Sequence, residues 1–102
     1  MTNEIFTKVR TEIQKILSDV KEFRHRIHEE PEIALAEYKT REKILGFLKG
    51  LPLEIHKPYI GTDVVADLKG RTDRTIVLRA DIDALPLKEE SECVYRSKID
   101  GM

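Results

Sequence analysis

The 102-residue sequence has one cysteine, no apolar run long enough to cross a membrane, and almost no excess of either charge. Because Cys93 has no second cysteine to pair with, an internal disulfide is excluded and a reducing compartment is favoured. A membrane-spanning helix would need about 18 consecutive apolar residues. The opening, MTNEIFTKVRTEIQK, is charged throughout and lacks the apolar centre of a secretory signal. These absences predict a cytoplasmic protein with no membrane partner.

The charge balance and the missing motifs exclude further classes. The sequence has 18 basic and 19 acidic residues, so its net charge is −1, and we expect no nucleic-acid partner. It also lacks a glycine-rich phosphate loop, a G-x-S-x-G motif and a C-x-x-C motif. With 40% hydrophobic and 36% charged residues, the composition is that of one globular domain or a piece of one.

Apolar residues at spacings of three and four predict two helices at the start of the chain. The first covers Ile5–Ile27 and ends before Pro31, because the residue before a proline avoids helical angles. The second is expected from about Glu37 to Lys49, with Gly50 as its stop. The stretch PEIALA between them indicates an ordered connector.

Three runs after Pro52 have the character of strands. Leu53–Tyr59 is short, Asp63–Gly70 alternates, and Thr75–Asp81 contains apolar residues without alternation, which is typical of a strand covered on both faces. The last two runs flank a turn-rich link, so we predict that they form an antiparallel hairpin. The predicted fold class is α/β, with two helices followed by three strands.

Two aspartates, Asp81 and Asp83, follow the last predicted strand. Side chains alternate along a strand, so both would point to the same face. Sites in open α/β sheets collect at the carboxyl ends of strands, and a divalent metal would relieve the repulsion between the two carboxylates. Alternatively, both aspartates form turns or cap a helix, with Arg79 as the counter-ion. The spacing alone leaves both interpretations open.

The other potential ligands give weaker signals. His25 and His28 can share a face of the first helix, but that helix offers no carboxylate to complete a metal site. We expect a structural role for them, since positive charge is favourable near a helix C-terminus. His56 has no obvious partner. Cys93 lies in a polar loop without a nearby histidine, so we expect an ordinary thiol rather than a nucleophile.

Three segments are more specific together than any one alone. They are FRHRIHEEPEIALAEYKTREKI (Phe23–Ile44), GTDVVADLKG (Gly61–Gly70) and IVLRADIDALPLKEE (Ile76–Glu90). In this order and spacing they resemble the N-terminal part of the metal-dependent aminoacylase and carboxypeptidase superfamily. The most similar subgroup is the amidohydrolases that include hippurate hydrolases, N-acyl-amino-acid deacylases and auxin-conjugate hydrolases. The residues that match its pattern are Arg24 or Arg26, His28, Pro31-Glu32, Glu37, Thr40 and the unbroken run Arg79–Pro86.

The resemblance implies a phosphorylase/hydrolase-like catalytic domain with a mixed sheet between helices, of which residues 1–102 would be an incomplete N-terminal portion. It implies two divalent metal ions (zinc, manganese or cobalt) in the full-length enzyme, a metal-bridged water as nucleophile, and a glutamate as general base. The substrate would be an N-acyl amino acid or small peptide, and an inserted domain would form a homodimer. The family's metal-binding run, His-Ala-Cys-Gly-His-Asp, would follow Met102. We therefore expect this segment alone to bind no metal and to be inactive.

The same resemblance limits the roles of the aspartates. Asp83 matches the aspartate that orients a metal ligand, and Asp81 stands where much of the superfamily has a ligand histidine. As candidate catalytic-site residues, Asp83 would orient the site, Asp81 would shape it, and Pro86 would fix the exit of the strand. Two alternatives stay open: a truncated module that self-associates through open sheet edges, and a metal-storing or regulatory protein that uses the aspartates and histidines.

Overall fold

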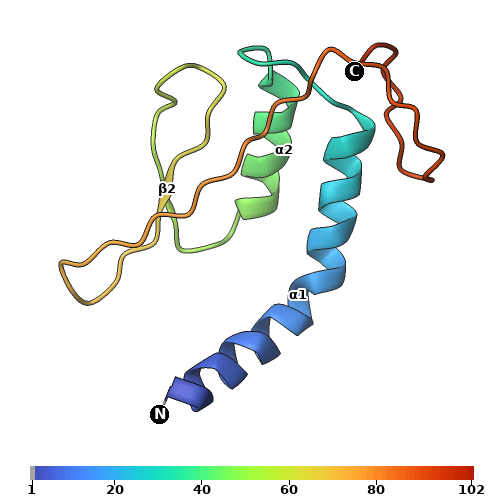
Figure 1. Cartoon of the computed structure of the whole chain (residues 1–102). Helices are drawn as coiled ribbons and strands as arrows, with labels where there is room; N and C mark the ends of the chain where they lie inside the picture. Colours follow the sequence, from blue (N-terminus) through green and yellow to red (C-terminus); the bar gives the residue numbers. More distant parts are fainter. Residues whose placement is uncertain (1) are drawn as a thin grey trace.

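The computed structural model describes residues 2–102 and contains two helices, a small antiparallel sheet and a long irregular segment (Figure 1). The elements in chain order are α1 (Thr2–Glu29), α2 (Tyr38–Leu48), β1 (Glu54–Ile55) and β2 (Ala66–Asp67). The α/β class and the order of helices before sheet are as the sequence predicts. No helix in residues 2–102 is both long and apolar enough to pass through a membrane.

Helix α1 has 28 residues and extends three residues beyond the predicted start at Ile5. An acidic residue, Glu4, lies in its first turn, and Arg26 and His28 lie in its last turn. This arrangement complements the helix dipole, whose N-terminal end is positive and whose C-terminal end is negative. The helix ends shortly before Pro31, as the sequence predicts.

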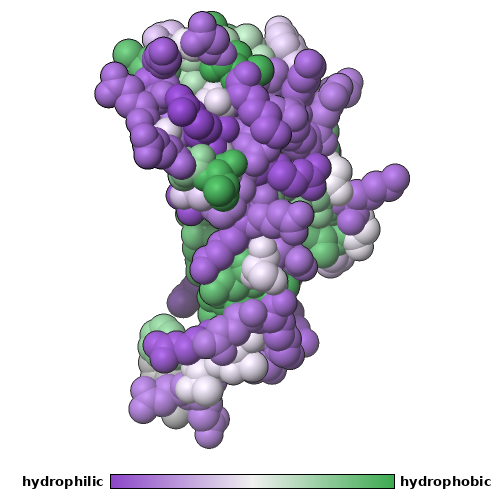
Figure 2. Space-filling model, turned by 90° about the vertical axis from the view of Figure 1, so that its right-hand side faces the viewer, coloured by the Kyte–Doolittle hydropathy of each residue, from purple (hydrophilic) through white to green (hydrophobic). Residues whose placement is uncertain are grey.

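The two helices contact each other near the C-terminal half of α1. The rings of Phe23 and Phe47 stack there, with 4.4 Å between their centroids. The N-terminal half of α1 extends away from the rest of the chain (Figure 1). Its apolar side chains are therefore exposed, and Figure 2 shows such apolar patches between polar side chains. They are Ile5, Phe6, Val9, Ile13, Ile16, Leu17 and Val20.

The strand pairing differs from the prediction. Strands β1 and β2 pair in the register Glu54↔Asp67 and Ile55↔Ala66. The sheet therefore joins the first and second predicted strands, and the predicted hairpin between Asp63–Gly70 and Thr75–Asp81 is wrong. No residue of Thr75–Asp81 is in a strand.

The third predicted strand, Thr75–Asp81, does not form because its apolar side chains are not covered. The side chains of Ile76, Val77 and Leu78 are 90%, 82% and 93% exposed. An apolar run without alternation becomes a stable strand when neighbours cover both of its faces, and residues 2–102 do not supply them. The chain is held just after this segment, where Ala84 forms a parallel bridge with Ile33. The apolar pattern indicates a segment that would be stable as a strand only when buried, and the side chains of Ile76, Val77 and Leu78 are exposed.

The described residues form contacts without a closed apolar core. None of their apolar side chains is fully buried, and the buried residues are Glu37, Thr40 and Thr62. The firmest packing therefore surrounds polar groups at the start of α2 and in the loop before β2.

Replacing Phe47 with alanine should loosen α2 from α1. Phe47 is 42% exposed, so we expect a loss of about 1–2 kcal/mol, below the roughly 3–5 kcal/mol of a fully buried phenylalanine. Amide hydrogen exchange in α2 should accelerate about 5–30-fold. Phe6→Ala is the control, because Phe6 is 67% exposed and its loss should leave exchange in α2 unchanged. Equal effects of the two substitutions would contradict the role of the stacked pair.

Candidate functional site

The two predicted site residues lie on the exposed segment that follows Leu78. Asp81 Oδ1 is 2.8 Å from Arg79 Nη2, and both side chains are mostly exposed. An ion pair in that position contributes about 0–1 kcal/mol. Asp83 is also exposed. The Arg79 contact is the one that the counter-ion interpretation of Asp81 predicts, whereas the role of Asp83 as an orienting residue stays a prediction.

The backbone next to Asp83 is held by the connector between the helices. The N–H of Ala84 donates to the carbonyl oxygen of Glu32 at 2.8 Å, and Ile33 forms a parallel bridge with Ala84. Residues far apart in the sequence are thereby brought together. This hydrogen bond holds the aspartate segment beside the connector between α1 and α2.

The side chain of Glu32 holds the start of α2. Its carboxylate accepts hydrogen bonds from the hydroxyl of Thr40 at 2.7 Å and from the backbone N–H groups of Lys39 and Thr40. Glu37, which occupies the N-cap position, makes no capping hydrogen bond. Its Oε1 instead accepts from the N–H of Leu35, whose φ is 65°. A carboxylate eight residues upstream of Thr40 therefore satisfies two of the free N–H groups at the start of this helix, those of Lys39 and Thr40.

The same hydrogen bonds alter the acidity of Glu32. Partial burial acts to raise the pKa of its carboxyl, but the hydrogen bonds from the Thr40 hydroxyl and from the N–H groups of Thr40 and Lys39 outweigh it. The pKa of Glu32 therefore lies below its usual value. This carboxylate is charged at neutral pH and serves as a fixed acceptor.

Helix α2 also carries the loop that leads to β2. Arg41 Nε donates to the carbonyl oxygen of Asp63 at 3.1 Å, and the carboxylate of Asp63 accepts from the N–H groups of Tyr59 and Ile60. These N–H donors hold the pKa of Asp63 below its usual value. His56, for which the sequence offered no obvious partner, directly follows β1 and contacts Asp67 of β2, with Nε2 2.7 Å from Oδ2.

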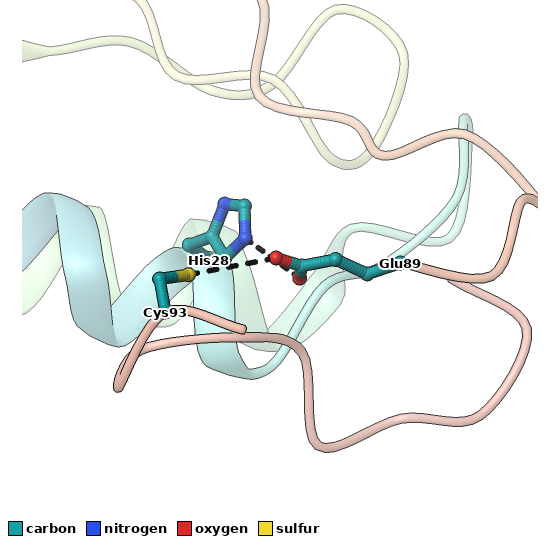
Figure 3. A group of neighbouring side chains, drawn as sticks. All are labelled: His28, Glu89 and Cys93. Carbon is teal, nitrogen blue, oxygen red and sulfur yellow. Dashed lines mark hydrogen bonds and ion pairs between the residues drawn. The ribbon is translucent and has the colours of Figure 1, made fainter. Parts of the chain in front are cut away.

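A second cluster forms where the end of α1 meets the last loop of the chain (Figure 3). His28 Nε2 lies 2.8 Å from Glu89 Oε1, and Cys93 Sγ lies 3.7 Å from Glu89 Oε2. One nitrogen, one oxygen and one sulfur atom of these side chains all lie within 4.8 Å of one another. The sequence led us to expect no histidine near Cys93. This expectation is wrong, because the fold brings His28 close to it.

The loop reaches His28 because it folds back on the end of α1. The N–H of Lys98 donates to the carbonyl oxygen of Glu29 at 2.8 Å. The ring of Tyr95 stacks on His25, with 3.8 Å between centroids, so His25 has the structural role that the sequence suggested. The sequence contains no signal that predicts these contacts, because His28 and Glu89 are 61 residues apart and the loop has no periodic pattern.

Glu89 is the centre of this cluster. Its carboxylate accepts from the hydroxyl of Ser91 and from the N–H of Ser97, and it contacts His28. These interactions, the Ser91 hydrogen bond first, lower the pKa of Glu89 to about 2, although desolvation acts in the opposite direction. Glu89 is therefore a charged acceptor with a fixed orientation.

Comparison with known proteins gives the family. No family model matches the chain. A hydrolase of Staphylococcus saprophyticus is 44% identical over 84 residues, which is 82% of this chain and 22% of that protein. An N-acetylcysteine deacetylase of Bacillus subtilis is 41% identical over 80 residues, covering 76% of this chain and 21% of that protein. Thermostable carboxypeptidase 2 of Saccharolobus solfataricus is 32% identical over 101 residues, covering 97% of this chain and 26% of that protein.

The fold agrees with these relatives. A crystal structure of a dinuclear metal-binding peptidase of the M20 family from Bacillus subtilis matches with a TM-score of 0.77 and 37% identity, over 86% of this chain and 25% of that one. The chain is homologous to M20-family metallopeptidases. The expected resemblance to the aminoacylase and carboxypeptidase superfamily is confirmed. The chain spans about a quarter of the length of the relatives that it matches.

Replacing Thr40 with valine tests the cap made by Glu32. Valine keeps the shape of this buried side chain but removes the hydroxyl donor, so the pKa of Glu32 should rise toward its usual value of 4.5. Nuclear magnetic resonance titration of the Glu32 carboxyl measures this shift directly. Thr72→Val, in the exposed turn before Arg74, is the control and should leave the pKa of Glu32 unchanged.

The sign of the stability change follows from the lowered pKa. A carboxyl with a lowered folded-state pKa stabilises fully above its unfolded-state value of 4.5, and this stabilisation is lost as the pH falls through the folded-state value. Thr40→Val should therefore cost about 1 kcal/mol at neutral pH and less in acid. A cost that grows as the pH falls would contradict the assignment.

Proposed function

We propose that the chain is the N-terminal segment of a metal-dependent amidohydrolase that cleaves the amide bond of N-acyl amino acids or small peptides. The observation that carries this proposal is the likeness to the M20 dinuclear metal-binding peptidase, at 37% identity and a TM-score of 0.77. The two relatives named as a deacetylase and a carboxypeptidase support it, since removing an acetyl group from an amine and a residue from a peptide C-terminus both break an amide bond. The match to the carboxypeptidase covers 97% of the chain and so includes Arg79–Pro86.

In this proposal residues 1–102 are an incomplete portion of a single catalytic domain, and the whole protein is a homodimer. A pair of divalent ions (zinc, manganese or cobalt) would polarise the amide carbonyl and lower the pKa of a bound water. Asp81 and Asp83 do not fit a metal pair by themselves. Asp81 is held by Arg79, and within residues 2–102 neither aspartate lies in a group of three possible ligands. We therefore assign no metal-dependent step to this segment.

In this proposal the segment places Asp81 and Asp83 at the active site. The hydrogen bond from Ala84 to Glu32 fixes the backbone directly after Asp83. From that point Asp83 would orient a ligand supplied by another part of the protein, Asp81 would shape the same wall, and Pro86 would direct the chain away. Orienting partners of this kind are worth about 10–100-fold in activity or metal affinity.

The test begins with the DNA that follows codon 102. If the reading frame continues, the longer protein should release the amino acid from N-acetyl amino acids or hippurate when zinc, manganese or cobalt is added. Asp83→Asn should lower kcat about 10–100-fold, while Asp73→Asn, in an exposed turn, should leave it unchanged. The 102-residue chain alone should show no turnover above buffer. Turnover by the short chain, or none by the longer protein with any of these metals, would contradict the proposal.

A second candidate function is that of a truncated assembly module without catalytic activity. The observation that favours it is the exposure of Ile76, Val77 and Leu78, at 90%, 82% and 93%. Three adjacent apolar side chains with unpaired backbone offer a second chain both apolar area and hydrogen-bonding groups. A stop codon directly after codon 102 would favour this function over the first.

Replacing Val77 with aspartate tests the assembly module. The wild-type chain should exceed its monomer mass of 11.8 kDa in light scattering at high concentration, and Val77→Asp should shift it toward that mass. Val94→Asp is the matched control, because Val94 is 99% exposed but lies outside the Ile76–Leu78 run. A sharply monomeric wild-type chain would contradict self-association.

A further inference from the structure

We propose that His28, Glu89 and Cys93 form a zinc-binding site where the last loop of the chain packs against the C-terminal end of α1. The three side chains come from two parts of the chain that are 61 residues apart at their closest pair. Figure 3 shows their polar ends converging, with dashed lines from the imidazole and from the thiol to the carboxylate of Glu89. This inference does not depend on the proposed amide hydrolysis.

The distances suit a metal of this size. Zinc binds sulfur at about 2.3 Å and nitrogen or oxygen at about 2.0–2.2 Å, so two ligands of a tetrahedral site lie roughly 3.3–3.7 Å apart. The Cys93 to Glu89 distance is 3.7 Å, the His28 to Glu89 distance is 2.8 Å, and all three ligand atoms lie within 4.8 Å of one another. The Cys93 to Glu89 distance lies at the upper end of this range, whereas the His28 to Glu89 pair is closer than the range and would have to separate on zinc binding.

The donor set favours zinc over the alternatives. A thiolate, an imidazole and a carboxylate are the ligands that zinc takes in proteins, whereas magnesium and calcium prefer oxygen alone. Zinc would replace the hydrogen-bonding proton between His28 Nε2 and Glu89 Oε1, and the thiol proton of Cys93 would pass to solvent. His28 is exposed, so water can reach the cluster and serve as the fourth ligand.

Surrounding groups already orient the ligands. The N–H of Ser97 donates to Glu89 Oε1 at 2.7 Å, and the hydroxyl of Ser91 donates to Oε2. Supporting hydrogen bonds of this kind raise the metal affinity of a carboxylate by fixing its direction. The negative end of the α1 dipole also favours a cation here. Arg96 and Lys98 act against it, but each is engaged, Arg96 with the carbonyl oxygen of Glu89 and Lys98 with the carboxylate of Glu29.

The geometry argues against a nucleophilic cysteine at the same place. A reactive cysteine needs a positive neighbour or a general base in contact with its sulfur. Here the nearest charged group to the sulfur of Cys93 is the carboxylate of Glu89, at 3.7 Å. This contact supplies no positive neighbour for the sulfur, whereas a metal ion could bind the sulfur and the carboxylate together.

Cobalt substitution tests the site in the 102-residue chain. Adding Co²⁺ to the reduced protein should produce thiolate-to-cobalt charge-transfer absorption, and because Cys93 is the only cysteine this absorption reports on that residue alone. Zinc should abolish it by displacement. Cys93→Ser should eliminate the absorption, and His28→Gln and Glu89→Gln should each weaken cobalt binding at least tenfold. His56→Gln is the matched control, since His56 also pairs with a carboxylate, that of Asp67, but lies outside the cluster.

A second measurement guards against variants that lose the loop structure. In the wild-type chain, zinc should slow alkylation of Cys93 at least tenfold, as measured by mass spectrometry, and a chelator should restore the rate. The absence of charge-transfer absorption in the wild-type chain would overturn the proposal. So would cobalt affinities of His28→Gln and Glu89→Gln within twofold of the wild type.

Discussion

The hydrogen bonds of Glu32 connect the parts of this structure. Its carboxylate holds the start of α2 through Thr40, and its carbonyl oxygen holds Ala84 next to Asp83. Helix α2 in turn holds the loop before β2 through the bond from Arg41 to Asp63. Glu32 thus links the aspartate segment and α2 to the connector after α1, while the stacked rings of Phe23 and Phe47 join α2 to α1 directly. In a chain without a closed apolar core, such polar contacts determine the arrangement.

The helices could be predicted because their signals are local. Apolar spacing and Pro31 indicated α1, and Gly50, whose φ is 88°, correctly marked the end of α2. The pairing of strands depends instead on residues distant in sequence. The local pattern of apolar residues therefore indicates how much burial a segment requires, but not which segment pairs with it. The composition of Thr75–Asp81 is typical of a strand covered on both faces, and the described residues leave it uncovered.

The candidate sites show the same difference between features with a local sequence signal and features that depend on contacts between distant residues. The spacing of Asp81 and Asp83 drew attention to them, and the order of three sequence segments identified the family before any geometry was known. The cluster of His28, Glu89 and Cys93 could not be found in this way. Its members share no motif, and they meet because the last loop folds back on the end of α1, where Lys98 and Tyr95 attach it. Neighbours along the chain are a poor guide to such a cluster.

The lack of a buried apolar core has a thermodynamic consequence. The heat capacity change of unfolding is set mainly by the apolar area that water gains access to, and here much of that area is already hydrated in the folded chain. The stability curve of these 102 residues should accordingly be shallow in temperature, and their melting gradual rather than all-or-none. Covering the apolar side chains of α1 and the Ile76–Leu78 run would make the transition sharper, so cooperativity itself reports whether these surfaces have found a partner.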